Sequence, residues 1–397
     1  MGFHAIQYGN IQPDPDTLVM AAGGDILIKE SLSRLQQEKG PEYLFSCLKP
    51  VFHRADIVFA NLETPLLKEG KKNSTKNPNY PFFKNDPSLA EALRSAGFTL
   101  LCLANNHILD YGLEGLRTTC EALNGQGIQF VGAGLTAEES CRPVSFSVKG
   151  YRITFLAYSL AYAATGSSGG CAPLKEEVML QGISKVRAHS DIIVISLHHG
   201  IEYSDYPIPE SRQLNKRLAA AGADIILGHH PHVMQGMEVF ANSIMIHSMG
   251  SLIYDNTPEQ DKQALRSCLL VKKGGIKFPE NDSRTREGMI FLFGFHRNKA
   301  VTIQMVPVVQ DYREIPKIPE ERAYQDILRH YQRISNDLLS DEYPNASLLQ
   351  QLSAVEYLSE LKNSSATELL WKLSRARPRH LRHLWFALKH YAKGQTV

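Results

Sequence analysis

The sequence is poor in cysteine, has no strong excess of either charge and contains no long apolar run. Its six cysteines are scattered, with no Cys-x-x-Cys pair, so they indicate neither a disulfide framework nor a zinc ribbon. No stretch approaches the roughly 18 apolar residues that a membrane helix requires, and the N-terminus has no basic segment followed by an apolar one. These absences predict a cytoplasmic chain without a signal peptide or a transmembrane segment.

The net charge of +2 is too small to indicate nucleic acid as the partner. Hydrophobic residues make up 43% and charged residues 21% of the 397 residues, as in an ordinary globular protein. This length suggests a core domain of roughly 250–300 residues with additions.

From Thr17 onward, short apolar runs alternate with amphipathic segments. The apolar runs predict buried strands at 18–22, 57–60, 99–103, 192–197, 225–227 and 244–246. Helices are expected between them; in "NDPSLAEALRSAG", Asp86 would cap the helix, Pro87 would start it and Gly97 would end it. "VSFSVKGYRITFLAYS" predicts a hairpin with its turn at Lys149 and Gly150. Together these patterns indicate a layered α/β sandwich.

The character of the sequence changes beyond about residue 307, where several segments have helical periodicity. We expect a first domain over 1–310 and a helical, basic extension over 311–397. Within the extension, 372–393 carries seven Lys or Arg and no acid. Such a helix either docks on an anionic membrane surface or acidic partner, or packs on the domain with a solvated basic face. Two polar inserts, at 66–86 and 161–177, predict loops, which are either functional lids or plain surface insertions.

The most unusual stretch is "GADIILGHHPHVMQGMEVF", where His229, His230 and His232 follow an apolar run. Imidazoles are costly to bury without partners. The three histidines are therefore either solvated loop residues or ligands that a metal ion draws together.

Polar side chains follow almost every predicted strand, and the C-terminal edge of an α/β sheet is where ligands bind. Carboxylate oxygens and imidazole nitrogens suit Mn²⁺, Zn²⁺ or Fe²⁺. Two such ions about 3.5–4 Å apart could activate a bridging water, and a neighbouring histidine could protonate the leaving oxygen. Besides the histidine turn, the residues at these strand ends are Asp25, Asn61, Glu63, Asn105, Asn106, His107, Asp110, His198, His199 and Glu202.

Each cluster has a structural explanation when it is taken alone. Asp25 could cap a helix, Asn61 and Glu63 could form an Asx-turn beside a surface carboxylate, and His198 with His199 could be a packed pair. Their joint occurrence at successive strand ends is what indicates a shared site. A closed structural zinc site is disfavoured, because ligands at an open strand edge leave room for water.

Six segments resemble, in sequence and order, the CapA family of bacterial capsule or poly-gamma-glutamate synthesis proteins. They read "GGDILI", "FANLETPL", "LANNHILDYG", "SLHHGIEY", "GHHPHV" and "IHSMGSLIYD", and the resemblance covers about 17–256. It implies an α/β fold of the calcineurin-like metallophosphoesterase type, a four-layer α/β/β/α sandwich with a metal cleft at the strand ends.

The resemblance also implies roles for individual residues. His107 corresponds to the proton donor to the leaving group; we place Asp110 and Glu202 with it in the catalytic set, with the weaker signal at Glu202. One or two divalent ions, Mn, Fe or Zn, are expected, and His229 could replace one member of the closing His-x-His pair. The implied metal ligands are Asp25, Asn61, Glu63, Asn106, His198, His230 and His232.

The sequence departs from the wider superfamily at several positions. Leu27 stands where phosphoesterases have a histidine ligand, and the second acidic motif reads Asn-Leu-Glu, so a dinuclear site has lost a ligand. His247 and Ser251 replace the usual Tyr and Asn of the family. Many relatives carry an N-terminal membrane anchor, and none is expected here.

Two hypotheses follow. The first is a metal-dependent hydrolase that acts on an acidic polymer or a phosphoester, with other capsule-synthesis subunits as partners. The alternative is a non-catalytic polymer-binding or assembly subunit of a poly-gamma-glutamate synthesis machinery. Replacing His107 by alanine distinguishes them, because a hydrolase should lose turnover by roughly 10²–10⁴-fold and a binding protein should tolerate the change.

Overall fold

The computed structural model describes residues 3–12, 14–76, 80–166, 168–255, 284–312 and 314–339. Most of the expected C-terminal extension, including the basic segment 372–393, lies outside the described residues.

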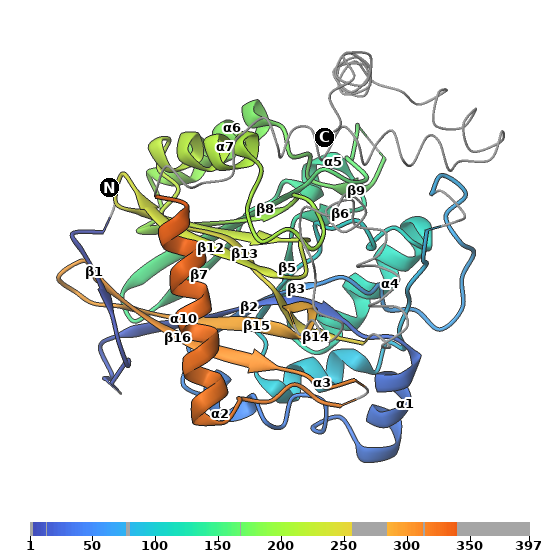
Figure 1. Cartoon of the computed structure of the whole chain (residues 1–397). Helices are drawn as coiled ribbons and strands as arrows, with labels where there is room; N and C mark the ends of the chain where they lie inside the picture. Colours follow the sequence, from blue (N-terminus) through green and yellow to red (C-terminus); the bar gives the residue numbers. More distant parts are fainter. Residues whose placement is uncertain are drawn as a thin grey trace, which may run out of the picture.

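Two β-sheets form the centre of the molecule (Figure 1). The first has the order β1-β16-β15-β2-β3-β4-β5, with β14 also paired to β2. Its strands are β1 (Ala5–Tyr8), β2 (Leu18–Leu27), β3 (Ile57–Leu62), β4 (Leu100–Cys102), β5 (Gln129–Val131), β14 (Ser251–Tyr254), β15 (Glu287–Phe295) and β16 (Ala300–Val309).

The second sheet has the order β12-β13-β11-β10-β8-β7. Its strands are β7 (Val144–Val148), β8 (Tyr151–Ser159), β10 (Ile192–His198), β11 (Ile225–His229), β12 (Met234–Phe240) and β13 (Ser243–Met249). The central strands β8, β10, β11 and β13 are parallel, and the edge strands β7 and β12 are antiparallel to their neighbours. A small third sheet pairs β6 (Ala133–Gly134) with β9 (Gly170–Cys171).

The two large sheets pack face to face. Phe59 of β3 stacks on Phe155 of β8 with ring centroids 5.8 Å apart, so apolar side chains from both sheets share one core. Along β10 the apolar side chains alternate: Ile192 and Val194 belong to that core, whereas Ile193 and Ile195 belong to a second one. This period of two is expected for a strand that is buried on both faces.

Helices cover both outer faces. On the second sheet, α6 (Glu176–Arg187) and α7 (Pro209–Ala220) supply Met179, Ile183 and Leu218 to the second core. The first sheet is covered by α1 (Glu30–Lys39), α2 (Lys49–Phe52), α3 (Leu89–Ala96) and α4 (Gly112–Gly125); α5 (Ala137–Ser140) is a single turn. In Figure 1, α6 and α7 lie above the sheets and α1, α2 and α3 lie below them. The α/β/β/α order of four layers is therefore confirmed.

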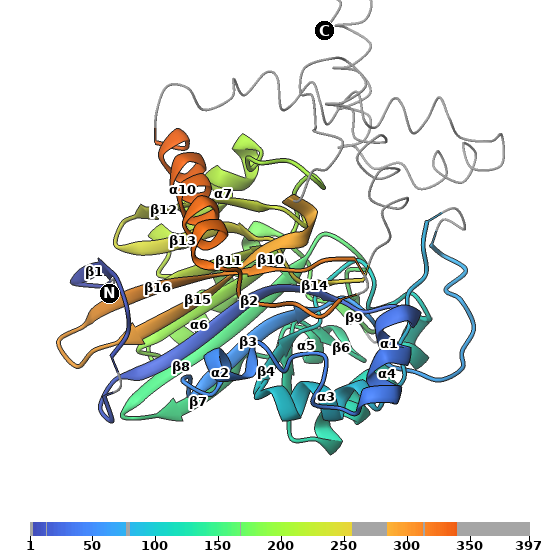
Figure 2. The same ribbon diagram turned by 60° about the horizontal axis from the view of Figure 1, so that its bottom comes forward.

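Helix α10 (Glu321–Asp337) connects the two sheets at one end of the molecule and lies beside β12 and β13 in Figure 2. Its Tyr331 packs on Phe291 of β15 with ring centroids 5.7 Å apart. Its Ser335 hydroxyl accepts a hydrogen bond from the backbone N–H of Met237 at 3.0 Å. The first helix of the expected extension thus packs on the sandwich.

Most predicted elements are confirmed, and two expectations are corrected. The hairpin turn is confirmed, with φ values of 49° at Lys149 and 83° at Gly150. The expected cap at Asp86 and start at Pro87 are wrong: α3 begins at Leu89, because Asp86 accepts the Ser88 N–H and a tight turn precedes the helix. The first strand is longer than predicted, so Asp25 lies inside β2 and not after it.

No helix in the described part of the chain is both long enough and apolar enough to cross a lipid bilayer.

Candidate metal centre

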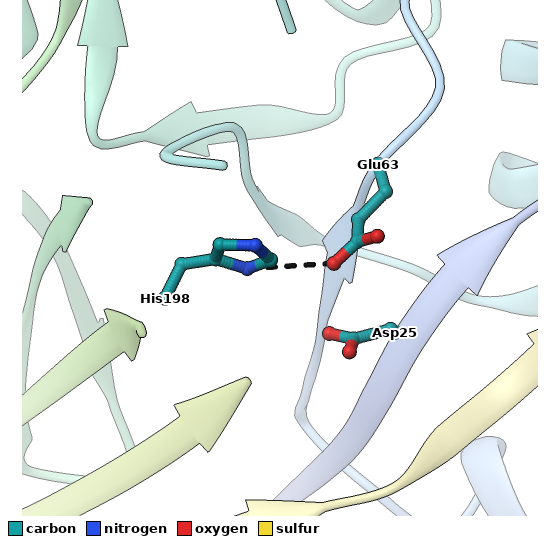
Figure 3. Close-up of side chains that lie close together, drawn as sticks. All are labelled: Asp25, Glu63 and His198. Atoms are coloured by element: carbon teal, nitrogen blue, oxygen red, sulfur yellow. Dashed lines mark ion pairs between the residues drawn. The ribbon is translucent and has the colours of Figure 1, made fainter. Parts of the chain in front are cut away.

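Three acidic or imidazole side chains from separate strands meet between the two sheets (Figure 3). Asp25 lies in β2, Glu63 directly follows β3, and His198 ends β10. All three are buried, and one potential ligand atom of each lies within 4.8 Å of the others. Nδ1 of His198 is 3.4 Å from Oε1 of Glu63. The structure thus brings together one residue from each of three of the clusters that the sequence singles out.

An irregularity in β2 turns Asp25 into this centre. The pairing of β2 with β3 shifts register between Ala22 and Asp25, and such bulges redirect side chains. Gly24 makes the local crossing with β14 feasible, because a Cβ atom there would lie 1.9 Å from the carbonyl oxygen of Gly250. Close packing therefore requires glycine at position 24, directly before Asp25.

Asn61 holds both acids in place, and Asn105 in turn holds Asn61. The amide nitrogen of Asn61 donates to Asp25 Oδ1 at 2.8 Å and to Glu63 Oε1 at 3.0 Å. Its oxygen accepts from the amide of Asn105 at 3.2 Å. In this arrangement Asn61, which the resemblance places among the ligands, orients two carboxylates with its nitrogen. Asn106 Oδ1 lies 3.0 Å from Nε2 of His198, so it too lies at the centre.

The histidine turn closes the site from the second sheet. His232 lies between the two acids, with Nδ1 3.3 Å from Asp25 Oδ2 and Nε2 3.7 Å from Glu63 Oε2. The ring of His230 is 4.9 Å from that of His198. Both His230 and His232 have positive φ, 99° and 56°, a costly conformation for residues other than glycine that clusters at functional sites.

His229, the open alternative at this turn, contacts Asp25 from the side. Its Nδ1 is 2.9 Å from Asp25 Oδ1, and the backbone N–H of His230 donates to Oδ2 of the same carboxylate at 3.1 Å. His229 is fully buried, so it fixes the orientation of the carboxylate from within the core.

The burial of these groups strongly perturbs their protonation. Burial alone would raise the pKa of Asp25, but hydrogen bonds from His229 and His232 hold that pKa well below its usual value. Burial, followed by the charge of Asp25, raises the pKa of Glu63 well above its usual value. Burial would lower the pKa of His232, yet Glu63 and Asp25 raise it to about 9. Asp25 is therefore held in its charged form, whereas the neighbouring Glu63 favours its neutral form unless a cation compensates its charge.

The donor set fits a divalent cation. Glu63 Oε2, His229 Nε2 and His230 Nδ1 are buried without a hydrogen-bond partner among the described residues, and buried polar atoms normally have one. A cation between the acids would favour the charged form of Glu63, and His nitrogen with carboxylate oxygen suits Mn, Fe or Zn. Leu27 is buried and offers no ligand, which reduces the support for a second ion.

The expected proton donor has its own set of partners. His107 Nδ1 lies 2.9 Å from Asp110 Oδ2. The Lys76 ammonium forms an ion pair with Asp110 Oδ1 and lies 3.2 Å from His107 Nδ1. Phe83 donates its backbone N–H to Asp110 at 2.8 Å, and its ring lies 4.5 Å from that of His107. Burial has the largest effect on His107 and lowers its pKa, and the hydrogen bond to Asp110 opposes this shift.

Two tyrosines and Glu202 lie at the edge of the centre. The rings of Tyr203 and Tyr254 are 6.4 and 4.8 Å from that of His232, and their hydroxyls are 3.3 Å apart. Glu202 is half-buried. Its negative charge is among the causes that act to raise the pKa of Glu63, His107 and His232. Glu202 thus influences the predicted site through its charge.

Sequence reasoning misses two residues of this site. Lys76 and Phe83 come from the polar insert 66–86, for which the sequence predicts a loop without naming these residues, and their contacts with His107 connect distant parts of the chain. Asn105 is among the strand-end residues that the sequence names, but the sequence gives it no role; its amide oxygen accepts the N–H of His107, and an Asn two residues before a functional His is a signal for such a turn.

The fold and site define a class: a four-layer α/β/β/α protein with a candidate metal centre at the strand ends. Residues 19–256 match the family described as bacterial capsule synthesis protein PGA_cap. The chain belongs to this family.

Two curated relatives illustrate the similarity. The capsule biosynthesis protein CapA of Bacillus anthracis is 34% identical over 248 residues, which cover 60% of each chain. The PGA biosynthesis protein CapA of Bacillus subtilis is 30% identical over 265 residues, which cover 66% of this chain and 69% of the relative. The match thus spans about 60% of the first relative's length. Among solved structures, a 5′-nucleotidase from Candida albicans aligns with 10% identity and a TM-score of 0.39, covering 90% of this chain and 58% of that one.

Proposed function

We propose that the chain is a metal-dependent hydrolase of the phosphoesterase type, acting on an acidic bacterial surface polymer. One observation carries the proposal: Asp25, Glu63 and His198 are buried together with their potential ligand atoms within 4.8 Å. Buried acids are expensive without a compensating charge. The three residues come from three different strands or strand ends. Beside them lie nitrogen and oxygen atoms that have no hydrogen-bond partner in the described part of the chain. Both features support a site built to hold a cation.

Asp25, Glu63, His198 and His232 would hold the ion, with His230 and Asn106 beside them. When bound, a divalent ion supplies Lewis-acid activation of water and of the scissile group. Asn61 orients both carboxylates through its amide nitrogen, and His229 fixes Asp25. The chain's own contribution is thus a rigid set of ligands whose orientation is fixed from the core.

His107 would deliver the proton to the leaving group. Its Nδ1 faces Asp110, which leaves Nε2 as the nitrogen available to a substrate. Asp110 accepts from Lys76 and from the Phe83 N–H as well, so the carboxylate cannot rotate freely. General-acid catalysis of this kind contributes roughly 10²–10⁴-fold to a rate.

Family membership and the names of the relatives support an acidic polymer as the substrate, since one is named for capsule and the other for PGA biosynthesis. The bond cleaved would be a phosphoester or an amide within that polymer. Because these relatives are named for capsule and PGA biosynthesis, other capsule-synthesis subunits would be the partners of the chain.

Metal analysis of the purified protein is the first test. We expect about one equivalent of Mn, Fe or Zn in the wild type and its loss in Glu63→Gln, which removes the ligand charge but preserves shape. His189→Ala is the matched control, because His189 is exposed just after the end of α6. A wild type that takes up no Mn, Fe or Zn on reconstitution would contradict the proposal.

Turnover separates the hydrolase from a non-catalytic polymer-binding subunit. With p-nitrophenyl phosphate and a gamma-glutamyl anilide as substrates, His107→Ala should keep its metal and lose roughly 10²–10⁴-fold in kcat. A protein that binds metal, hydrolyses neither substrate and tolerates His107→Ala would instead be an assembly subunit.

A further inference from the structure

The second of the two adjacent histidines at the end of β10 is buried, although it is not one of the proposed ligands. Consecutive side chains of a strand point to opposite faces of its sheet. His198 accordingly faces the acids of the first sheet, with Nδ1 3.4 Å from Glu63 Oε1 (Figure 3). His199 faces the helix layer, where its Nδ1 lies 3.0 Å from the hydroxyl oxygen of Ser211 in α7. The two histidines therefore have different surroundings.

The backbone of His199 is hydrogen-bonded to the histidine turn. Its N–H donates to the carbonyl oxygen of His229 at 3.2 Å, and His198 lies opposite His229 in the pairing of β10 with β11. His199 thus follows one proposed ligand in the chain and is bonded to the segment that carries two more. A movement of His199 would displace ligands on both strands.

The loop after β10 contacts the histidine turn a second time. The backbone N–H of Tyr203 donates to the carbonyl oxygen of Pro231 at 2.8 Å. Between these two contacts the turn holds His230 and His232 at φ values of 99° and 56°. Residues other than glycine keep such a conformation only where the surrounding structure enforces it. The loop that begins with His199 supplies part of that enforcement.

Ser211 holds the ring of His199 from a rigid support. It is buried in the first turn of α7, and its hydroxyl is the hydrogen-bond partner of the His199 ring among the described residues. Helix α7 packs on the second core through Leu218 and Ala219, which fixes the helix against the sheet. The bond from Ser211 therefore ties the end of β10 to a packed helix.

Asn215, one turn further along α7, makes a similar bond in a different place. It is also buried, and its amide nitrogen lies 3.2 Å from Nδ1 of the buried His247. Nε2 of His247 lies 3.0 Å from Glu238. His247 belongs to β13, a strand that carries none of the proposed ligands. The two bonds thus share their chemistry and their helix, but only the one from Ser211 leads to the metal centre.

We infer that Ser211 and His199 are positioning residues of the metal centre. Ser211 fixes the His199 ring, and His199 fixes His198 relative to the histidine turn. This inference rests on the proposed function, because it requires a cation at the centre. Groups that orient metal ligands typically contribute roughly 10–100-fold to affinity. Ser211 acts through His199, so the loss of its hydroxyl should weaken metal binding by about tenfold, the lower end of that range.

Calorimetric titration of the metal-free chain with Zn²⁺ tests the inference without any turnover step. Ser211→Ala should bind Zn²⁺ about tenfold more weakly than wild type, whereas Ser211→Thr keeps the hydroxyl and should retain the wild-type affinity. Asn215→Ala is the matched control: it also removes a bond to a buried histidine, and its Zn²⁺ affinity should not change even if its melting temperature falls. With Co²⁺ in place of Zn²⁺, the visible absorption bands report the ligand geometry and should shift in Ser211→Ala alone.

The inference is overturned if Ser211→Ala keeps the wild-type affinity and Co²⁺ bands, or if Asn215→Ala loses as much affinity as Ser211→Ala does. If Ser211→Ala does not fold, Ser211→Cys gives the same test with a side chain of similar size, because a thiol donates only weakly; an unchanged affinity there would again contradict the inference. A wild type that takes up no metal would refute the proposed function and the inference together. A wild type that binds metal, with Ser211→Ala unchanged, would refute the inference alone.

Discussion

The ammonium of Lys76 lies 3.2 Å from Nδ1 of His107 and forms an ion pair with Asp110, the carboxylate that His107 also contacts. The Lys76 side chain is only 8% exposed and that of Asp110 is fully buried. A lysine from the insert 66–86 therefore completes the surroundings of the proposed proton donor. Burial lowers the pKa of this lysine, and Asp110 opposes the shift.

Replacing Lys76 by methionine should lower kcat more than it changes KM or metal content. Loss of the ammonium frees the Asp110 carboxylate to move, and a misplaced proton donor can cost on the order of 10²-fold. Asp110 would keep His107 and the Phe83 N–H as partners but lose its only lysine ion pair among the described residues, which should reduce the free energy of unfolding by up to about 3 kcal/mol. Steady-state kinetics and urea unfolding measure the two effects.

Lys72→Met is the matched control, because Lys72 lies on the same insert, is exposed and also contacts the Phe82 ring. It should change neither quantity. Lys76→Arg should recover part of the activity. A Lys76→Met protein that is less stable but fully active would show that Lys76 serves the fold alone.

The sequence predicts where the site forms, because apolar runs identify the strands and polar residues mark their ends. Asp25 and Glu63 can be assigned to one place without coordinates, since parallel neighbouring strands share an edge. His198 ends a strand of the other sheet, and it joins the two acids only because the two sheets pack face to face. The contacts of Lys76 cannot be assigned in this way, because they depend on how an irregular insert folds back over a turn some 30 residues later. Similarly, the sequence names Asn61 as a site residue but not whether its oxygen or its nitrogen faces the acids.

His229 should behave as a residue that orients a ligand. Its Nδ1 lies 2.9 Å from Asp25 Oδ1, and second-layer partners of metal ligands typically contribute roughly 10–100-fold to affinity. We therefore expect His229→Ala to weaken metal binding by roughly 10–100-fold, and His232→Ala to weaken it more. Titration of the metal-free variants with Zn²⁺ or Mn²⁺ measures this difference. The assignment fails if His229→Ala weakens binding more than His232→Ala does.

Gly228 should be irreplaceable for steric reasons. A Cβ atom there would lie 1.8 Å from the carbonyl oxygen of His247 in the neighbouring strand β13. Gly228→Ala would therefore push β11 from β13 and displace the histidine turn, and we expect a loss of stability of several kcal/mol, beyond the usual range for overpacking of about 1–3 kcal/mol.

Gly125→Ala is the control for this substitution. Gly125 ends α4, and no neighbouring atom in the described part of the chain lies within 4 Å of the position that a Cβ atom would take. Alanine there should be neutral or stabilise by up to about 1 kcal/mol. Thermal unfolding of both variants gives the comparison. Equal melting temperatures for the two would refute the steric argument.

Glu238 gives the fold a defined dependence on pH. It lies in β12 and accepts two hydrogen bonds from Arg212 of α7, both 2.7 Å long, and its Oε1 is 3.0 Å from Nε2 of the buried His247. Burial would raise the pKa of Glu238, but Arg212 and His247 lower it to about 2, from an ordinary value of 4.5. Because the folded-state pKa is the lower one, the charged carboxylate stabilises the fold above about pH 4.5, and this stabilisation is lost as the pH falls toward 2.

Glu238→Gln should remove this contribution. The wild type should lose up to about 3 kcal/mol more free energy of unfolding between about pH 5 and pH 2 than the variant does. Glu138→Gln, at an exposed position of α5, should follow the wild-type curve. Urea midpoints across this range measure the difference, and parallel curves for wild type and Glu238→Gln would mean that the Arg212 pair does not hold the carboxylate in its charged form.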